Sequence, residues 1–520
     1  MKNFILSLIF AATLVILWFG HGNLMGGGEA GVLFYNLSKI SDISFPAWGN
    51  QILGGSSGIT VSSGPIYQFL SFIQKQGISG QLIQAVFFFI ILILTMSSMN
   101  FLYCVIFNEK SSLKFITSGL FYLLNPYSLM NIWNRFLPNT MVFYAVLPLV
   151  LGLYIKAIKE KKLVYAILAS LFTAIFAYGF AAPAQTLIFL GLVTVLFLYE
   201  LIIEKRFWFV TKYYLVSIVT WGLFNFWWIF SQISFRFSAA YTNVSEEFFS
   251  SSGNLDTFMS LSRSLGQLKN LFLLKHGTFF SQAIDLPFSW PLFYDKLPSL
   301  IIEWGVVLTV LYLVVKHLKN KWIVFLLLIF AIGIFGSKGS TPPLGELFQY
   351  LFEKITYIQF FRNPFEKIGI LLPLALSPLV GFAFGNLYHR FGKKILVIAG
   401  LYLLVFLGFP FWTSLVFTSG NPPANDPNVG YQVIVPEYYK QADEWLSSQP
   451  GQFRFMSLPL GGEGIFYKWP KGYVGVEQSG VLFSTPSISY NTTIPFYHQI
   501  AIKLQQLFMV YKDFYKVADL

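Results

Sequence analysis

Apolar stretches long enough to cross a membrane recur along the chain, and they constrain its fold more than any other feature. Eleven lie between residues 4 and 417, and most approach the ~20 residues that a helix needs to cross about 30 Å of hydrocarbon. Only 11% of the 520 residues are charged, less than half of the roughly one quarter typical of soluble domains. The sequence therefore predicts an all-α polytopic membrane bundle.

The predicted spans cover residues 4–19, 83–107, 113–130, 138–156, 163–181, 184–203, 211–232, 298–315, 322–336, 367–388 and 395–417. The first span follows Lys2 and also suits a secretory signal peptide. No clean small-x-small cleavage site comes after it, so we interpret it as a retained signal anchor.

The basic residues indicate the orientation of these spans. The short connections on one side, together with Lys2, carry 16 of the 35 Lys and Arg residues and 4 of the 23 acids, whereas the other side carries 19 of each. The whole net charge of +12 therefore lies on one side, as the positive-inside rule requires. We expect a multi-pass protein of the cell membrane with a cytoplasmic N-terminus and an extracytoplasmic C-terminal region, in contact with lipid and not with nucleic acid.

We expect residues 1–418 to form the membrane domain, with outer loops at 21–82, 233–297 and 337–366, and residues 419–520 to form an extracytoplasmic α/β region. In that region the spacing predicts a helix over 437–448, with Tyr438, Ala442 and Trp445 on one side, and a strand over 453–460. Residues 500–520 return to helical spacing, but little of the chain is left to cover their apolar face. We therefore expect the sequence to stop inside a larger extracytoplasmic domain.

Glu29 is the first candidate for chemistry. It follows three glycines about ten residues after the first span, so it can lie near the outer membrane surface, and glycines allow a sharp turn or a close approach to a ligand. A carboxylate there can act as a general base toward a hydroxyl. The alternative is a solvated loop acid. The aromatic and glycine-rich run through Trp48 follows in the same loop.

Two further segments carry cations at the expected outer surface. Arg135 is the only charge in a short aromatic loop, and its guanidinium suits either a phosphate or lipid head groups. Arg362, Asn363, Glu366 and Lys367 surround Pro364 at the entry to the tenth span. Arg362 and Lys367 can neutralise a phosphate leaving group. The alternative is a cluster that anchors the helix at the interface.

Other site types have little support in the sequence. The five histidines are scattered, Cys104 is the single cysteine, and neither HExxH nor CxxC occurs, although a divalent cation on outer carboxylates stays open. The sequence also lacks the phosphate-binding loop G-x-x-x-x-G-K-[ST]. The patterns G-x-G-x-x-G (Gly26 to Gly31) and G-x-S-x-G (Gly54 to Gly58) both occur in the expected outer loop 21–82, and not between a predicted strand and a helix as a dinucleotide site or a nucleophile elbow requires. Nucleotide-driven pumping and serine hydrolysis are therefore not expected.

The chain resembles the GT-C glycosyltransferases, and among them the α-(1→3)-arabinofuranosyltransferase family and YfhO-type membrane proteins. The resemblance depends on Glu29, the run through Trp48 and Gly55, the Asn-Pro-Tyr…Trp-Asn-Arg stretch ending at Arg135, the stretch around Arg362, and the tail opening at Val435. The chain departs from the family in having Glu29 where Asp or an Asp/Glu pair is usual, and in its short tail.

This resemblance implies an inverting transfer of a sugar from a polyprenyl-phosphate donor to an extracytoplasmic glycan. Glu29 would be the general base, Arg362 with Arg135 or Lys367 would hold the phosphate, and Trp48, Asn363 and Glu366 would line the substrate groove. Two alternatives remain open. One is a transporter or flippase for a lipid-linked glycan, and the other is a non-catalytic factor in cell-envelope assembly.

Overall fold

The computed structural model describes residues 2–46, 48–49, 56–109, 112–237, 252–275, 289–417, 430–457, 465–488, 499, 503–504 and 506–507. The chain divides into two compact units. Unit 1 consists of Met1–Leu17, Phe89–Asn225 and Ser251–Val416, and unit 2 of Trp18–Phe88, Phe226–Ser250 and Phe417–Leu520.

A helical segment lies at each of the eleven predicted spans. The segments are α1 (Lys2–Phe19), α4 (Gly80–Phe107), α5 (Ser112–Leu124), α7 (Pro138–Glu160), α8 (Leu163–Ile175), α10 (Pro183–Glu204), α11 (Phe207–Arg236), α16 (Leu297–Val315), α17 (Lys321–Ser337), α20 (Leu371–Phe391) and α21 (Lys394–Gly400), which continues as the π-helix η4 (Leu401–Leu407) and α22 (Phe409–Trp412). Among the described residues, α4, α7, α10, α11, α16 and α20 are long and apolar enough to cross a membrane. The number of crossings and their direction stay predictions.

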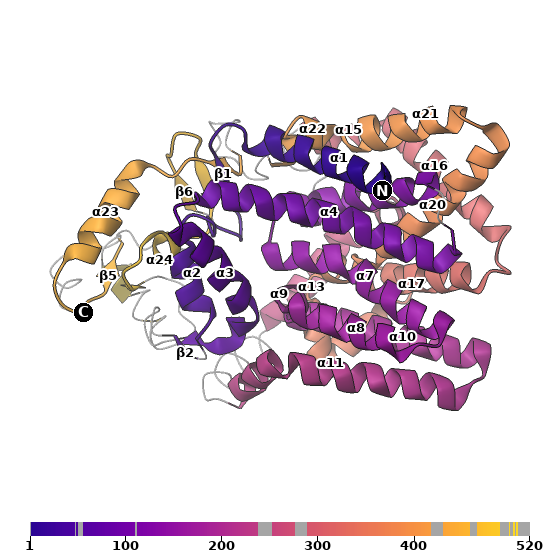
Figure 1. Ribbon diagram of the computed structural model, residues 1–520, viewed down its shortest axis with the longest axis horizontal. Helices are drawn as coiled ribbons and strands as arrows, with labels where there is room; N and C mark the ends of the chain where they lie inside the picture. The colour runs from indigo at the N-terminus through magenta and orange to yellow at the C-terminus, as the bar shows by residue number, and fades with distance from the viewer. Residues whose placement is uncertain are drawn as a thin grey trace. The chain divides into compact units, whose positions relative to one another are not determined.

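The core of unit 1 forms around two helices that are buried along most of their length. Helix α20 packs against α5, α16 and α17, and α7 packs against α8, α10 and the short helix α9 (Ala177–Phe180). Helices α7, α8 and α10 run roughly parallel to one another (Figure 1). Both central helices are apolar on all sides, as expected of helices enclosed by others.

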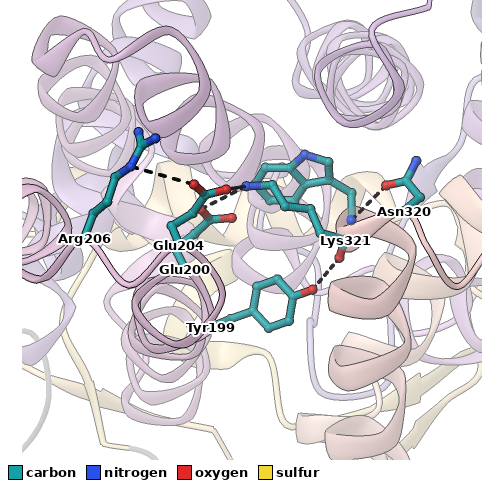
Figure 2. A network of polar contacts seen from close by, with 7 residues as sticks. Tyr199, Glu200, Glu204, Arg206, Asn320 and Lys321 are labelled. Atoms are coloured by element: carbon teal, nitrogen blue, oxygen red, sulfur yellow. Dashed lines mark hydrogen bonds and ion pairs between the residues drawn. The ribbon is translucent and has the colours of Figure 1, made fainter.

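A polar network joins α10 to α17 (Figure 2). The ammonium group of Lys321 lies 3.2 Å from the Glu200 carboxylate and 2.7 Å from that of Glu204. The Tyr199 hydroxyl donates to the carbonyl of Lys321 at 2.6 Å. One lysine at the start of α17 therefore binds two successive turns of α10, and its partner Glu200 is fully buried.

Shorter elements complete unit 1. They are α6 (Pro126–Ser128), the π-helix η2 (Leu129–Trp133), α13 (Ser252–Leu265), α14 (Leu268–Phe272), α15 (Ser289–Phe293), α18 (Gly345–Lys354), the 3₁₀ helices η3 (Thr356–Phe361) and η5 (Leu415–Phe417), and α19 (Pro364–Ile368). Lys275, just after α14, forms a buried ion pair with Glu303 of α16.

Unit 2 joins the segment after α1 to the C-terminal tail. Strand β1 (Leu24–Met25) pairs antiparallel with β4 (Gln432–Val433), although about 400 residues separate them in sequence. Its other strand pairs are β2 (Trp48–Gly49) with β3 (Ser56–Ser57), β5 (Phe455–Met456) parallel to β8 (Ser487–Ile488), and β6 (Ile465–Tyr467) with β7 (Tyr473–Gly475). Its described helices include η1 (Gly58–Ser63), α2 (Leu37–Ser44), α3 (Gly64–Lys75), α23 (Glu437–Ser448) and α24 (Ser479–Leu482).

The core of unit 2 is formed by both of these segments. Its fully or largely buried members are Val32, Val433, Trp469, Tyr473, Leu482 and Phe483. Helix α23 has the predicted bounds, but the side that packs on the core is not the one that carries Tyr438, Ala442 and Trp445 together. Tyr439, Ala442 and Leu446 pack against the core, whereas Tyr438 and Trp445 are exposed.

The rest of the predicted tail is described only in part. Strand β5 lies within the predicted strand 453–460, whose last three residues lie outside the described residues. Most of the predicted helical segment 500–520 also lies outside them.

Candidate functional site

In unit 1, the Asn-Pro-Tyr segment is held by its own side chains. Asn125 caps α6, and its side-chain oxygen accepts from the backbone N–H of Ser128 at 3.1 Å. Its amide nitrogen donates to the carbonyl of Tyr122 at 2.7 Å and to the hydroxyl of Tyr144 at 3.1 Å. Because Asn125 is fully buried, these bonds replace those it would make with water. They fix the path of the chain into η2, which leads to Arg135.

The stretch around Arg362 contacts this segment. Pro364 opens α19, and Asn363 caps it by accepting from the backbone N–H of Glu366. The hydroxyl of Tyr127 donates to the carbonyl of Glu366 at 2.8 Å. The ring of Tyr127 also packs edge-on against Phe365, with 5.6 Å between the ring centroids. Two motifs more than 230 residues apart in sequence therefore meet in unit 1.

The cations of these two motifs have different surroundings. Arg135 forms an ion pair with Glu366, and both side chains are about four-fifths buried. Arg135, Glu366 and Lys367 line a cavity of about 30 Å³ with Asn131 and Gln185, which has room for water. Arg362 follows η3, is exposed, and is not among the residues that line this cavity.

In unit 2, Glu29 lies at the exposed tip of a tight glycine turn. Gly27 and Gly31 each donate a backbone hydrogen bond to the other, at 3.0 and 3.1 Å. The φ angles of Gly27 and Gly31 are +132° and +64°, and that of Gly28 is +53°. Residues other than glycine rarely adopt positive φ angles. The turn therefore places Glu29 at an exposed position.

Residues of the C-terminal tail form backbone hydrogen bonds with this turn. The N–H of Gly28 donates to the carbonyl of Val474 at 2.8 Å, and the N–H of Val476 donates to the carbonyl of Gly28 at 3.0 Å. Beside them, Tyr473 donates its hydroxyl to the carbonyl of Val476 at 2.6 Å. Burial raises the pKa of Tyr473 well above its usual range, so this hydroxyl keeps its proton and stays a donor at neutral pH.

The seven predicted site residues therefore belong to two groups. Arg135, Glu366 and Lys367 come together in unit 1, with Asn363 beside them as a helix cap and Arg362 exposed nearby in sequence. Glu29 and Trp48 belong to unit 2. Trp48 lies in β2, and its side chain is outside the described residues.

The described part of the chain contains no cluster of side chains that could form a metal site. Across those residues, no three histidine, cysteine or acidic side chains lie close enough together to hold an ion.

The comparisons with known proteins concern the fold. No family model and no curated protein matches the sequence. Two cryo-EM structures of the arabinofuranosyltransferase AftD from Mycobacteria match 98% of this chain, each with a TM-score of 0.59 and 13% sequence identity. The chain therefore shares its fold with the matched part of AftD. It covers 33% and 34% of those chains, about a third of their length.

A third structure is more distant. The archaeal oligosaccharyltransferase AglB from Archaeoglobus fulgidus, in complex with an inhibitory peptide and a dolichol-phosphate, matches 88% of this chain and 62% of its own. Its sequence identity is 13% and its TM-score 0.45. The fold shared with AftD and the six long apolar helices make this chain a membrane protein.

Sequence reasoning missed the residues that support the candidate side chains. Tyr127, which contacts Glu366, stands in a motif that the sequence singled out, but its partner lies 239 residues away. Gln84 and Gln478, which bond to the backbone on either side of Glu29, stand in no motif. Only contacts between distant segments identify them.

Proposed function

We propose that this chain is a membrane glycosyltransferase that transfers a sugar from a polyprenyl-phosphate donor to an extracytoplasmic glycan. The observation that supports this most is the likeness to the arabinofuranosyltransferase AftD over 98% of the chain. The exposed carboxylate on a glycine turn and the cations before α20 are the groups that such a transfer needs.

Glu29 is the proposed general base. It takes the proton of an acceptor hydroxyl, whose oxygen forms a bond to the anomeric carbon of the donor sugar from the side opposite the phosphate. The bond between that carbon and the phosphate oxygen breaks, its electron pair stays on the departing polyprenyl phosphate, and the configuration inverts.

Arg362 and Lys367 are the proposed partners of the lipid phosphate. Charge grows on the phosphate as the bond breaks, so a fixed cation stabilises the transition state more than the ground state. Arg135 is already paired with Glu366. We therefore assign Arg135 to holding α19 in place, and assign the phosphate first to Arg362. We assign the sugar and acceptor contacts to Trp48 and Asn363.

The test is transfer by the purified protein in liposomes that contain a polyprenyl-phosphate-linked sugar. Glu29→Gln should lower the rate about 10²-fold or more, because a general base contributes about that much. Arg362→Gln should lower it to a similar extent. Asp42→Asn is the matched control, because Asp42 is an exposed acid in the same outer segment.

Two results would contradict the proposal. One is full transfer by Glu29→Gln, whatever the activity of Asp42→Asn. The other is movement of the lipid-linked sugar across the bilayer without any transfer, which would indicate a flippase.

A further inference from the structure

Three glutamine amides hold the backbone of the segment that carries Glu29. Gln84 of α4 accepts from the N–H of Met25 and donates to the carbonyl of the same residue, both at 2.8 Å. Gln478 accepts from the N–H of Val32 at 2.8 Å. Gln74 of α3 accepts from the N–H of Leu37 and donates to the carbonyl of Tyr35, both at 2.9 Å.

Gln84 and Gln478 act on the two sides of the Glu29 turn. Gln84 bonds to the residue just before the glycines, and Gln478 bonds to the residue just after Gly31. Both amides are almost fully buried, with 2% and 1% of each residue exposed. A buried amide that loses its hydrogen-bond partner is costly in free energy, so these bonds strongly favour one position of the turn.

Gln478 is itself held in one orientation. Its amide nitrogen donates to the carbonyl of Val476 at 2.8 Å and to that of Glu477 at 3.2 Å. The side-chain oxygen must therefore face Val32. A Cβ on Gly31 would lie 2.6 Å from the amide nitrogen of Gln478, so the turn and the amide fit closely.

The tail thus contacts the turn at three successive places: Val474, Val476 and Gln478. We propose that Gln478 is a positioning residue for Glu29, and that the 473–478 segment of the tail is part of the catalytic machinery. This inference rests on the proposed function. Gln84 performs the same task from α4.

The matched control is Gln74. Like Gln84, it both accepts from and donates to the backbone of this segment, but at Leu37 and Tyr35, beyond the turn. Gln74→Met should therefore lower the stability of unit 2 without displacing Glu29.

The first measurement reads position alone. In a Cys104→Ser background, cysteines replace Glu29 and Lys440, and a spin label is attached to each. Lys440 is an exposed residue of α23. The distance between the two labels is then measured in detergent. Gln478→Met should broaden the distance distribution, whereas Gln74→Met should leave it narrow. An unchanged distribution in Gln478→Met would overturn the proposal, whatever the activity of the protein.

The second measurement reads chemistry. Gln478→Met should lower kcat about 10- to 100-fold, since small displacements of a catalytic group have effects of this size, with KM within about threefold. The double variant Glu29→Gln/Gln478→Met should be no slower than Glu29→Gln alone. A further drop in the double variant would show that Gln478 acts independently of Glu29.

A conservative variant separates positioning from folding. Gln478→Glu keeps an acceptor for the N–H of Val32 but cannot donate to the carbonyls of Val476 and Glu477. Both readouts should lie between those of the native protein and Gln478→Met, and a variant no better than Gln478→Met would contradict the role of the Val32 bond. If Glu29→Gln keeps native activity, the proposed base is wrong, while the spin-label result still decides the positioning.

Discussion

The ammonium group of Lys39 lies inside unit 2, and only 2% of the residue is exposed. It donates to the carbonyls of Ser484 and Thr485, each at 3.2 Å, and so ties α2 to the tail. Burial lowers the pKa of Lys39 from 10.5 to about 8, although the nearby carboxylates of Asp42 and Asp443 favour the charged form and Arg454 opposes it.

This burial predicts a pH dependence of stability. Between about pH 8 and 10.5 the unfolded chain binds a proton at Lys39 that the folded chain does not, so the free energy of unfolding should rise with pH in this window. The rise should be on the order of 3 kcal/mol.

The measurement is chemical unfolding of the purified protein at pH 7.5, 9 and 10, compared with Lys39→Met. The variant should lose this part of the pH dependence. A variant with the same slope as the native protein would show that other groups cause it.

At the residue scale, the sequence indicated which side chains carry charge at the expected outer surface. It did not indicate which of them form ion pairs with each other. Arg135 and Glu366 each stood in a motif that the sequence singled out, yet their ion pair joins positions 231 residues apart. Nothing in the local spacing of either motif specifies the other. The sequence therefore supplied the candidates, while the ion pair of Arg135 with Glu366 and the exposure of Arg362 needed the fold.

At the scale of single elements, the Glu29 turn depends on the absence of side chains. A Cβ on Gly27 would lie 2.7 Å from the ring of Tyr431 and 2.8 Å from the carbonyl oxygen of Val474. Gly22 also has a positive φ, +76°, but a Cβ there would meet nothing within 4 Å. A side chain at Gly27 would therefore meet both steric overlap and an unfavourable φ angle, whereas a side chain at Gly22 would meet only the unfavourable φ angle.

We predict that Gly27→Ala abolishes transfer and destabilises unit 2 by about 3 kcal/mol or more, because both strain and overlap must be relieved. Gly22→Ala should cost only about 1 kcal/mol and keep its activity. Thermal unfolding and transfer assays on the two variants provide the check. Equal losses in both would mean that the contact with Tyr431 and Val474 is unimportant.

The helices were predictable because their signal is local. Each of the eleven apolar stretches contains enough consecutive apolar residues to predict a helix by itself. Proline residues also indicate where several helices begin, as Pro138 does for α7 and Pro183 for α10. The inward face of α23 was not predictable from spacing. Tyr438 and Tyr439 are adjacent in sequence and chemically identical, so the sequence does not show which of them faces the core. Tyr439 does so because its ring packs against Trp469 and Phe483.

At the scale of the whole molecule, the proposed chemistry requires Glu29 on the outer side of the membrane. We predict that a cysteine at position 29 reacts with a membrane-impermeant maleimide in intact cells, in a Cys104→Ser background. A cysteine at position 319, an exposed site in a predicted cytoplasmic connection, should react only after permeabilisation. Labelling of position 319 alone would reverse the orientation and remove Glu29 from the proposed reaction.

The division into units was the least predictable level. The sequence indicated an outer loop at 21–82 and a tail beyond 418, but β1 pairs with β4 through only two residues on each strand. Strands this short carry no periodic signal that distinguishes them from loop. Their pairing is selected by the shared core around Val32 and Val433.

The bond between Val32 and Gln478 joins positions 446 residues apart, and this separation has a consequence for biosynthesis. When the segment around Glu29 leaves the ribosome, its partners at 474–478 have not yet been translated. The turn cannot reach its final shape until residues 474–478 have been translated and have reached the same compartment. A chain that stalls before residue 478, or that inserts incompletely, should therefore remain inactive.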